Sequence, residues 1–145
     1  MPPDLPSTVL PSPDLDLASK RKEECNAGDA KSCVDLGSRF EKGRGVARDE
    51  ARAAALYTRG CDAGSDQGCL NLGILFADGR GVGKDYVRAA GLFTKACEGG
   101  AAPACFNLGF LLQHRSTGKD KAGAAAAFAR GCALGDQDSC AKAQK

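Results

Sequence analysis

The 145-residue sequence has no tryptophan, one histidine and one methionine, which excludes a metal site built from several histidines. It also lacks a strong charge of either sign. Its 20 basic and 18 acidic residues leave a net charge of +2, which does not favour a nucleic acid or an anionic membrane surface as the partner. No apolar run approaches the roughly 20 residues of a membrane-spanning helix, and the amino terminus has no basic segment followed by an apolar one. We therefore expect neither membrane insertion nor an export signal in the chain as written.

The residue that the chain has in excess is cysteine. Its eight cysteines form four pairs with eight-residue spacing, and the first members of successive pairs are 36, 36 and 35 residues apart. An even number of cysteines in a small chain is typical of a disulfide framework, and a fixed period of this length is typical of a repeat protein. The pairs are Cys25 and Cys33, Cys61 and Cys69, Cys97 and Cys105, and Cys132 and Cys140.

Each period contains the pattern of two helices. In the middle unit, residues at i, i+3, i+4 and i+7 share one face of an amphipathic helix, here named helix A: Cys69, Leu72, Gly73 and Phe76. The Gly-Arg-Gly-Val stretches at 43–46 and 79–82 end helix A, because glycine readily adopts the positive φ of a helix terminus. Aspartates at 49, 85 and 120 then cap a second helix, B, which carries alanines and one aromatic residue.

These repeats define the domain organisation. Residues 1–13 hold five of the six prolines, and we expect them to form an extended or disordered arm. We expect residues 14–145 to form one repeat domain, with a half-repeat at 14–27, full repeats at about 28–63, 64–99 and 100–134, and a carboxyl-terminal half-repeat at 135–145. In the third repeat, residues 114–118 replace the Gly-Arg-Gly-Val loop with one residue fewer.

The combination of Leu-Gly-x-x-Phe, Gly-x-Gly-Val-x-x-Asp and Ala-Ala-x-x-aromatic over residues 14–145 resembles the Sel-1-like repeat, a relative of the tetratricopeptide repeat. With a cysteine pair in every unit, the chain is more similar still to the Helicobacter cysteine-rich proteins, which are secreted. This resemblance implies an all-α fold, a right-handed α-solenoid of helix-turn-helix repeats of about 36 residues, each stapled by a disulfide. It also implies a role in binding other molecules, and some of these relatives are described as penicillin-binding proteins or candidate β-lactamases.

The repeat pattern places the first cysteine of each pair in the last turn of helix B and the second in the first turns of the next helix A. Antiparallel helices joined by a short turn bring such residues to disulfide distance, so we predict that each cysteine bonds to the one eight residues away. Each bond closes a short loop, and in the chain-entropy model this stabilises the folded state by roughly 2–3 kcal/mol. Reduced cysteines packing as small apolar residues are the main alternative. A zinc site is disfavoured because the pairs are strung along the solenoid, and the absence of C-x-x-C disfavours a redox-catalytic role, so we expect no metal and no cofactor.

A partner is expected in the concave groove that helix A lines in related solenoids. By analogy with tetratricopeptide repeats, the residues two positions before and after the repeat leucine face this groove, and an asparagine precedes the leucine in two repeats. An asparagine amide both donates and accepts hydrogen bonds, which suits an extended peptide backbone. The predicted contact residues are Asn71, Asn107, Leu70, Ile74, Phe106 and Phe110. The alternative is that the apolar side chains pack between repeats and the asparagines bond locally.

Charge is also sorted along each repeat. The loops after helix A carry basic residues, and the turns before helix A carry acidic ones. A basic edge suits acidic peptides or anionic glycans, although helix dipoles favour the same distribution. The basic residues are Lys42, Arg44, Arg48, Arg80, Lys84, Arg115 and Lys119, and the acidic ones are Asp29, Asp62, Asp66, Glu98, Asp136 and Asp138.

Catalytic motifs are sparse. Three Ser-x-x-Lys matches resemble an element of serine β-lactamases, but the companion Ser-Asp-Asn and Lys-Thr-Gly elements are absent. The matches, at unrelated repeat positions, are Ser19 with Lys22, Ser116 with Lys119, and Ser139 with Lys142. The single histidine, His114, is expected to be a solvated loop residue. We therefore predict no catalytic residues.

The sequence favours a monomeric, non-enzymatic solenoid that binds a protein or peptide segment. The alternatives are a penicillin-binding or weakly β-lactam-hydrolysing protein and a redox-coupled assembly factor. Paired cysteines indicate secretion or the periplasm, whereas reduced thiols would indicate the cytoplasm.

Overall fold

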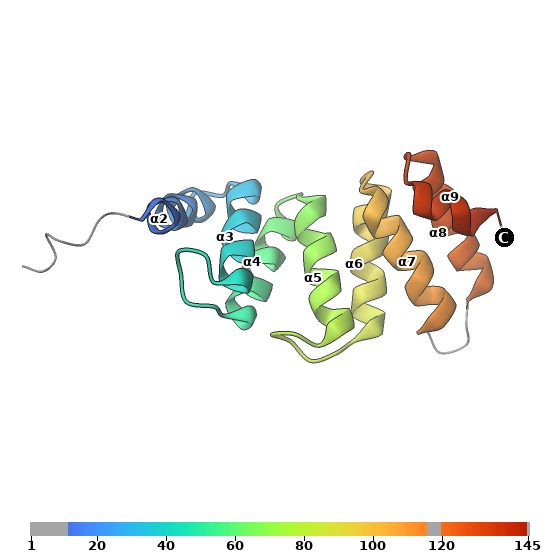
Figure 1. Cartoon of the computed structure of the whole chain (residues 1–145), viewed down its shortest axis with the longest axis horizontal. Helices are drawn as coiled ribbons and strands as arrows, with labels where there is room; N and C mark the ends of the chain where they lie inside the picture. Colours follow the sequence, from blue (N-terminus) through green and yellow to red (C-terminus); the bar gives the residue numbers. More distant parts are fainter. Residues whose placement is uncertain (1–11, 116–119, 145) are drawn as a thin grey trace, which may run out of the picture.

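The computed structural model describes residues 12–115 and 120–144, and this part of the chain contains helices and no strands. Eight helices follow one another along an elongated array in chain order, each packed against the next (Figure 1). They are α2 (Pro13–Asn26), α3 (Ala30–Lys42), α4 (Glu50–Asp62), α5 (Asp66–Asp78), α6 (Tyr86–Glu98), α7 (Ala102–His114), α8 (Lys121–Ala133) and α9 (Gln137–Ala143). The predicted all-α solenoid is confirmed, with α3, α5, α7 and α9 as A helices and the others as B helices.

The amino-terminal arm lies outside the described residues as far as residue 11. Helix α2 begins at Pro13, which the sequence pattern had assigned to the arm, and Ser12 is its N-cap. The Ser12 hydroxyl accepts a hydrogen bond from the backbone N–H of Leu15 at 3.4 Å. Proline is favoured in a first helical turn, where its fixed φ suits the helix and its missing N–H leaves no bond unmade.

Glycine and aspartate set the helix ends as predicted. Helices α3 and α5 end at Gly43 and Gly79, whose φ angles of 71° and 69° are left-handed. The N-caps of α4, α6 and α8 are aspartates whose carboxylates accept backbone N–H bonds at 2.7–3.0 Å: Asp49, Asp85 and Asp120. Helix α7 differs, because Arg115 occupies the position that Gly79 has one repeat earlier.

Within each repeat, the A and B helices touch where a glycine faces an aromatic ring. The pairs are Gly37 with Tyr57, Gly73 with Phe93, and Gly109 with Phe128. A Cβ atom on Gly73 would lie 2.7 Å from the nearest carbon of the Phe93 ring, well inside van der Waals contact. The glycine is therefore what lets the two helices approach this closely.

Between repeats, a disulfide joins each B helix to the following A helix. The four bonds link Cys25 to Cys33, Cys61 to Cys69, Cys97 to Cys105 and Cys132 to Cys140, with Cα atoms 4.3–4.7 Å apart. This is the predicted connectivity, and no cysteine is free. Six of these cysteines are buried in two apolar clusters, one with Cys25 and Cys33 and the other with Cys61, Cys69, Cys97 and Cys105.

Two polar contacts add to this stacking. Arg59 donates to the backbone carbonyl of Cys25 at 3.1 Å, and Arg130 donates to the equivalent carbonyl of Cys97 at 3.2 Å. Both carbonyls also accept a backbone N–H of the following turn, from Gly28 and Gly100, so each arginine adds a second bond at the carboxyl end of the B helix in the preceding repeat. None of the described helices combines the length and apolar character that crossing a membrane requires.

The glycine–aromatic contact generates a paired test. Gly73→Ala is expected to lower the free energy of unfolding by roughly 1–3 kcal/mol, because the added methyl group overpacks the Phe93 ring. Gly91→Ala on α6 is the matched control. A Cβ there meets nothing within 4 Å, so the higher helix propensity of alanine raises stability by about 0.5–1 kcal/mol. Urea unfolding of the oxidised proteins measures both, and equal effects of the two substitutions would contradict the packing account.

Candidate functional site

The A helices line one face of the molecule, and two adjoining hollows lie along it. The N-terminal hollow, about 540 Å³, lies between α3 and α5, with Tyr57 of α4 in its wall. Its lining residues are Lys31, Val34, Asp35, Ser38, Glu41, Lys42, Tyr57, Ser65, Gln67, Asn71 and Ile74.

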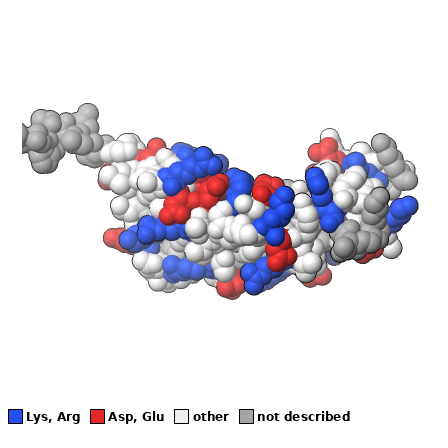
Figure 2. Space-filling view, turned by 90° about the horizontal axis from the view of Figure 1, so that it is seen from below, with Lys and Arg blue, Asp and Glu red and all other residues white. Residues whose placement is uncertain are grey.

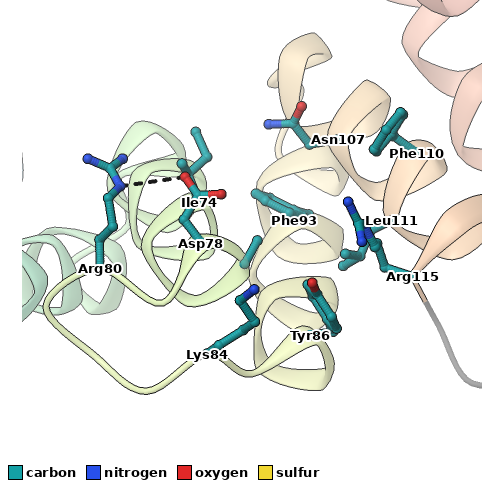
Figure 3. Close-up of a pocket in the computed structure, with 11 residues that line it drawn as sticks. Ile74, Asp78, Arg80, Lys84, Tyr86, Phe93, Asn107, Phe110, Leu111 and Arg115 are labelled. Atoms are coloured by element: carbon teal, nitrogen blue, oxygen red, sulfur yellow. Dashed lines mark ion pairs between the residues drawn. The ribbon is translucent and has the colours of Figure 1, made fainter.

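The C-terminal hollow, about 670 Å³, lies between α5 and α7 (Figure 3). Its lining residues are Ile74, Ala77, Asp78, Arg80, Lys84, Tyr86, Phe93, Asn107, Phe110, Leu111 and Arg115. Ile74 lines both hollows, so the two adjoin, and we refer to them together as the groove across α3, α5 and α7.

Four of the six predicted contact residues lie in this groove. Asn71 lines the N-terminal hollow, Ile74 lines both, and Asn107 and Phe110 line the C-terminal hollow. Phe110 is 42% exposed, which is unusual for a phenylalanine in a packed repeat.

The other two predicted contact residues are not in the groove. Leu70 is only 5% exposed and belongs to the apolar cluster that includes Cys61, Phe93 and Leu111, so the prediction that it faces the groove was wrong. Phe106 lines neither hollow and packs against Phe128, with ring centroids 5.7 Å apart. The physical reason is that an A helix inside a solenoid is covered on two sides, by the B helix before it and the B helix after it. Its buried stripe is therefore wider than the Leu-Gly-x-x-Phe pattern indicates.

The two groove asparagines differ in their bonding. Asn71 accepts a hydrogen bond from the Gln67 side chain one turn earlier, at 2.8 Å. This is the local bonding that the sequence left open as an alternative. The Asn107 side chain has no hydrogen-bond partner within the described part of the chain, so both its donors and its acceptor are available.

Charged groups connect the wall of the N-terminal hollow to the next repeat. Glu41 accepts the Tyr57 hydroxyl at 2.6 Å and pairs with Arg80 at 3.2 Å. Arg80 also pairs with Glu50 at 3.2 Å and with Asp78 at 3.5 Å. Burial of the Tyr57 ring, followed by its bond to Glu41, raises the pKa of the hydroxyl above its ordinary value. This network holds the Gly-Arg-Gly-Val loop of the second repeat against the first repeat.

The groove also contains residues that the contact pattern missed. Lys84, Tyr86 and Arg115 come from the α5–α6 loop, the start of α6 and the end of α7. The sequence places Lys84 and Arg115 only on a basic edge, because their distance from the repeat leucine gives no indication of groove position. Elsewhere, basic and acidic side chains are interspersed, as the face in Figure 2 shows.

None of the candidate catalytic serines that the structure describes forms a pair with its lysine. Ser139 is fully buried, and its hydroxyl donates to Asp136 at 2.5 Å. Ser19 and Lys22 are exposed on α2 without a hydrogen bond between them, although a serine nucleophile needs a base within hydrogen-bond reach. Ser116 and Lys119 lie outside the described residues.

His114 is exposed at the end of α7, with its ring centroid 4.5 Å from that of Phe110. Within residues 12–115 and 120–144, no cluster of three or more His, Cys, Asp or Glu side chains is arranged to hold a metal ion.

A family model described as Sel1 repeat matches three stretches of the chain, residues 30–65, 66–100 and 102–136. A search among curated proteins gives no significant match.

Several solved structures are similar to this one. A protective antigen of uropathogenic Escherichia coli with an SLR fold is 28% identical, with a TM-score of 0.79 over 84% of this chain and 26% of its own. Helicobacter pylori cysteine rich protein B is 25% identical, with a TM-score of 0.68 over 88% of this chain and 93% of its own. A Sel1 repeat protein from Oxalobacter formigenes is 23% identical, with a TM-score of 0.83 over 90% of this chain and 54% of its own. The chain thus spans about a quarter of the first of these proteins, about half of the third and nearly all of the second.

The raised pKa of Tyr57 predicts a pH dependence of stability. The unfolded chain loses this proton near pH 10, whereas the folded chain keeps it to higher pH. The stabilisation linked to Tyr57 is therefore fully present below pH 10 and is lost as the pH rises toward the folded-state pKa. The difference in unfolding free energy between wild type and Tyr57→Phe is expected to shrink above pH 10, by up to about 1.4 kcal/mol per pH unit. Urea titrations at pH 8, 10 and 11 measure it, and a difference that stays constant would contradict the assignment.

Proposed function

The chain belongs to the Sel1 repeat family, and on this premise we propose that it is a non-enzymatic scaffold that binds an extended peptide or protein segment along the groove of α3, α5 and α7. The observation that carries the proposal is that the two hollows adjoin at Ile74, on the face formed by α3, α5 and α7. An extended segment passing from one hollow to the other would meet apolar surface at Ile74 and Phe110 and an unengaged amide at Asn107.

The chemistry of these side chains fits a peptide better than a small substrate. An asparagine amide both donates and accepts hydrogen bonds, so it pairs with a peptide backbone whatever the side chains of that peptide are. Exposed aromatic residues in a concave surface are frequent anchor points in protein interfaces. Among the described residues of the groove, no nucleophile is arranged beside a base, which supports binding rather than catalysis.

The disulfides support an oxidising, extracytoplasmic compartment for this activity. All eight cysteines are paired, and such bonds persist outside the reducing cytoplasm. The similarity to Helicobacter pylori cysteine rich protein B points in the same direction. A redox-coupled role is less well supported, because no cysteine is left free to exchange with a partner.

Selection from a random peptide display library tests the groove directly. We expect the oxidised wild-type protein to enrich peptides from the library. These peptides are expected to bind the Phe110→Arg variant at least about tenfold more weakly than wild type, since removal of a central aromatic anchor typically has this effect. Val87→Arg is the matched control, because Val87 is 81% exposed and lines no described hollow. Its binding is expected to stay within about twofold of wild type.

Two results would overturn the proposal. One is equal loss of peptide binding in Phe110→Arg and Val87→Arg, which would show that the peptides do not bind in the groove. The other is turnover of a chromogenic β-lactam that disappears in Ser116→Ala and Lys119→Ala, which would favour the hydrolytic alternative.

A further inference from the structure

The two hollows differ in the formal charge of the residues that line them. In the N-terminal hollow, two carboxylates stand beside two lysines, and both carboxylates have further partners. Asp35 accepts from Arg21 and Arg39 at 3.0 and 3.1 Å, and Glu41 is held by Tyr57 and Arg80. Lys31 and Lys42 have no acidic partner among the described residues, but the lining of this hollow, with two lysines and two carboxylates, is neutral in formal charge.

The C-terminal hollow has an excess of positive charge. Arg80, Lys84 and Arg115 line it together with a single carboxylate, that of Asp78. Asp78 already pairs with Arg80, as the dashed line in Figure 3 marks. Lys84 and Arg115 have no acidic partner among the described residues, and the Lys84 ammonium lies 5.7 Å from the ring centroid of Tyr86.

Comparison of the repeats explains this imbalance. Lys84 corresponds to Arg48 one repeat earlier, and Arg48 pairs with Glu50 at 3.2 Å. Tyr86 stands in the position of Glu50, so the second repeat keeps the cation and replaces its carboxylate with an aromatic ring. The third repeat adds Arg115 where Gly43 and Gly79 end the earlier A helices. Both changes increase positive charge in the same hollow.

The positions of these groups indicate the shape of an occupant. In Figure 3, Lys84 and Arg115 lie toward the loop edge of the hollow, whereas Asn107 lies across the hollow, in the middle of α7. Phe110 and Leu111 lie on α7 with the amide. A bound segment that runs along the groove past Asn107 would reach Lys84 and Arg115 with one of its side chains rather than with its terminal carboxylate.

We infer that the C-terminal hollow selects a peptide segment with an aspartate or glutamate side chain within two residues of a large apolar side chain. The carboxylate pairs with Lys84 and Arg115, the apolar side chain packs on Phe110 and Ile74, and Asn107 bonds the backbone between them. This inference rests on the proposed groove binding and adds the chemistry of the partner.

The display library also tests this selectivity, because peptides fused through their carboxyl ends present side-chain carboxylates and no free terminal one. The peptides enriched on wild type are expected to place an acidic residue within two positions of an aromatic or branched aliphatic residue. The most enriched peptide is then synthesised with an amidated end, together with its Asn/Gln isostere. Fluorescence anisotropy is expected to give roughly three- to tenfold tighter binding for the acidic form at low salt, with the difference shrinking at high salt.

Variants assign the preference to the two cations. Lys84→Gln with Arg115→Gln is expected to bind both peptides equally, at the affinity that wild type has for the isostere. Lys20→Gln with Lys95→Gln is the matched control, because it removes two exposed positive charges that line none of the described hollows. Its preference for the acidic peptide should equal that of wild type.

The outcomes separate this inference from the proposed function. Enriched peptides without acidic residues, equal binding of the two synthetic peptides, or a preference that survives Lys84→Gln with Arg115→Gln would overturn the inference and leave groove binding intact. A preference that requires a free carboxyl end would also overturn it. If the library yields no peptide that depends on Phe110, both ideas fail.

Discussion

A cystine spans the turn between each B helix and the following A helix and holds their Cα atoms 4.3–4.7 Å apart. The other contacts depend on this constraint. In a solenoid each repeat contacts only its neighbours, so apolar burial is divided among small clusters instead of being concentrated in one core. Alanine is the most frequent buried apolar residue in the described part of the chain, glycines lie at the contacts with the aromatic rings, and both bury little apolar area per residue. Covalent closure of each short turn limits the freedom of the unfolded chain where this packing is thinnest.

The same spacing generates the groove. Within a repeat, the glycine–aromatic contact fixes the distance between A and B helices, and between repeats the cystine fixes the distance from B to the next A. Successive A helices are therefore presented at a regular interval, with their mid-helix residues toward the two hollows. The loop of the second repeat is held in register by Arg80, which reaches Glu41 and Glu50 in the first. A surface that binds along its length needs this rigidity, because a groove ordered only on binding loses affinity to the entropy of ordering.

Most of the fold follows from local rules and was predicted from the sequence. Helix ends at Gly43 and Asp49, and the eight-residue pairing of Cys61 with Cys69, depend on residues close together in the chain. The site depends on contacts across repeats, and there the sequence was less informative. The sequence around Leu70 does not indicate that α5 is covered by a B helix on both sides. The unpaired charge of Lys84 arises from the exchange of Glu50 for Tyr86, and its importance depends on which loop faces which hollow.

The central claim is that four covalent staples hold the array together, and intact mass after alkylation tests it most directly. Freshly isolated native protein, denatured and treated with iodoacetamide without reductant, is predicted to gain no alkyl groups, and the same protein after reduction should gain eight. Eight alkyl groups without reductant would contradict the account, because the cysteines would then be ordinary buried thiols and the solenoid would depend on packing alone.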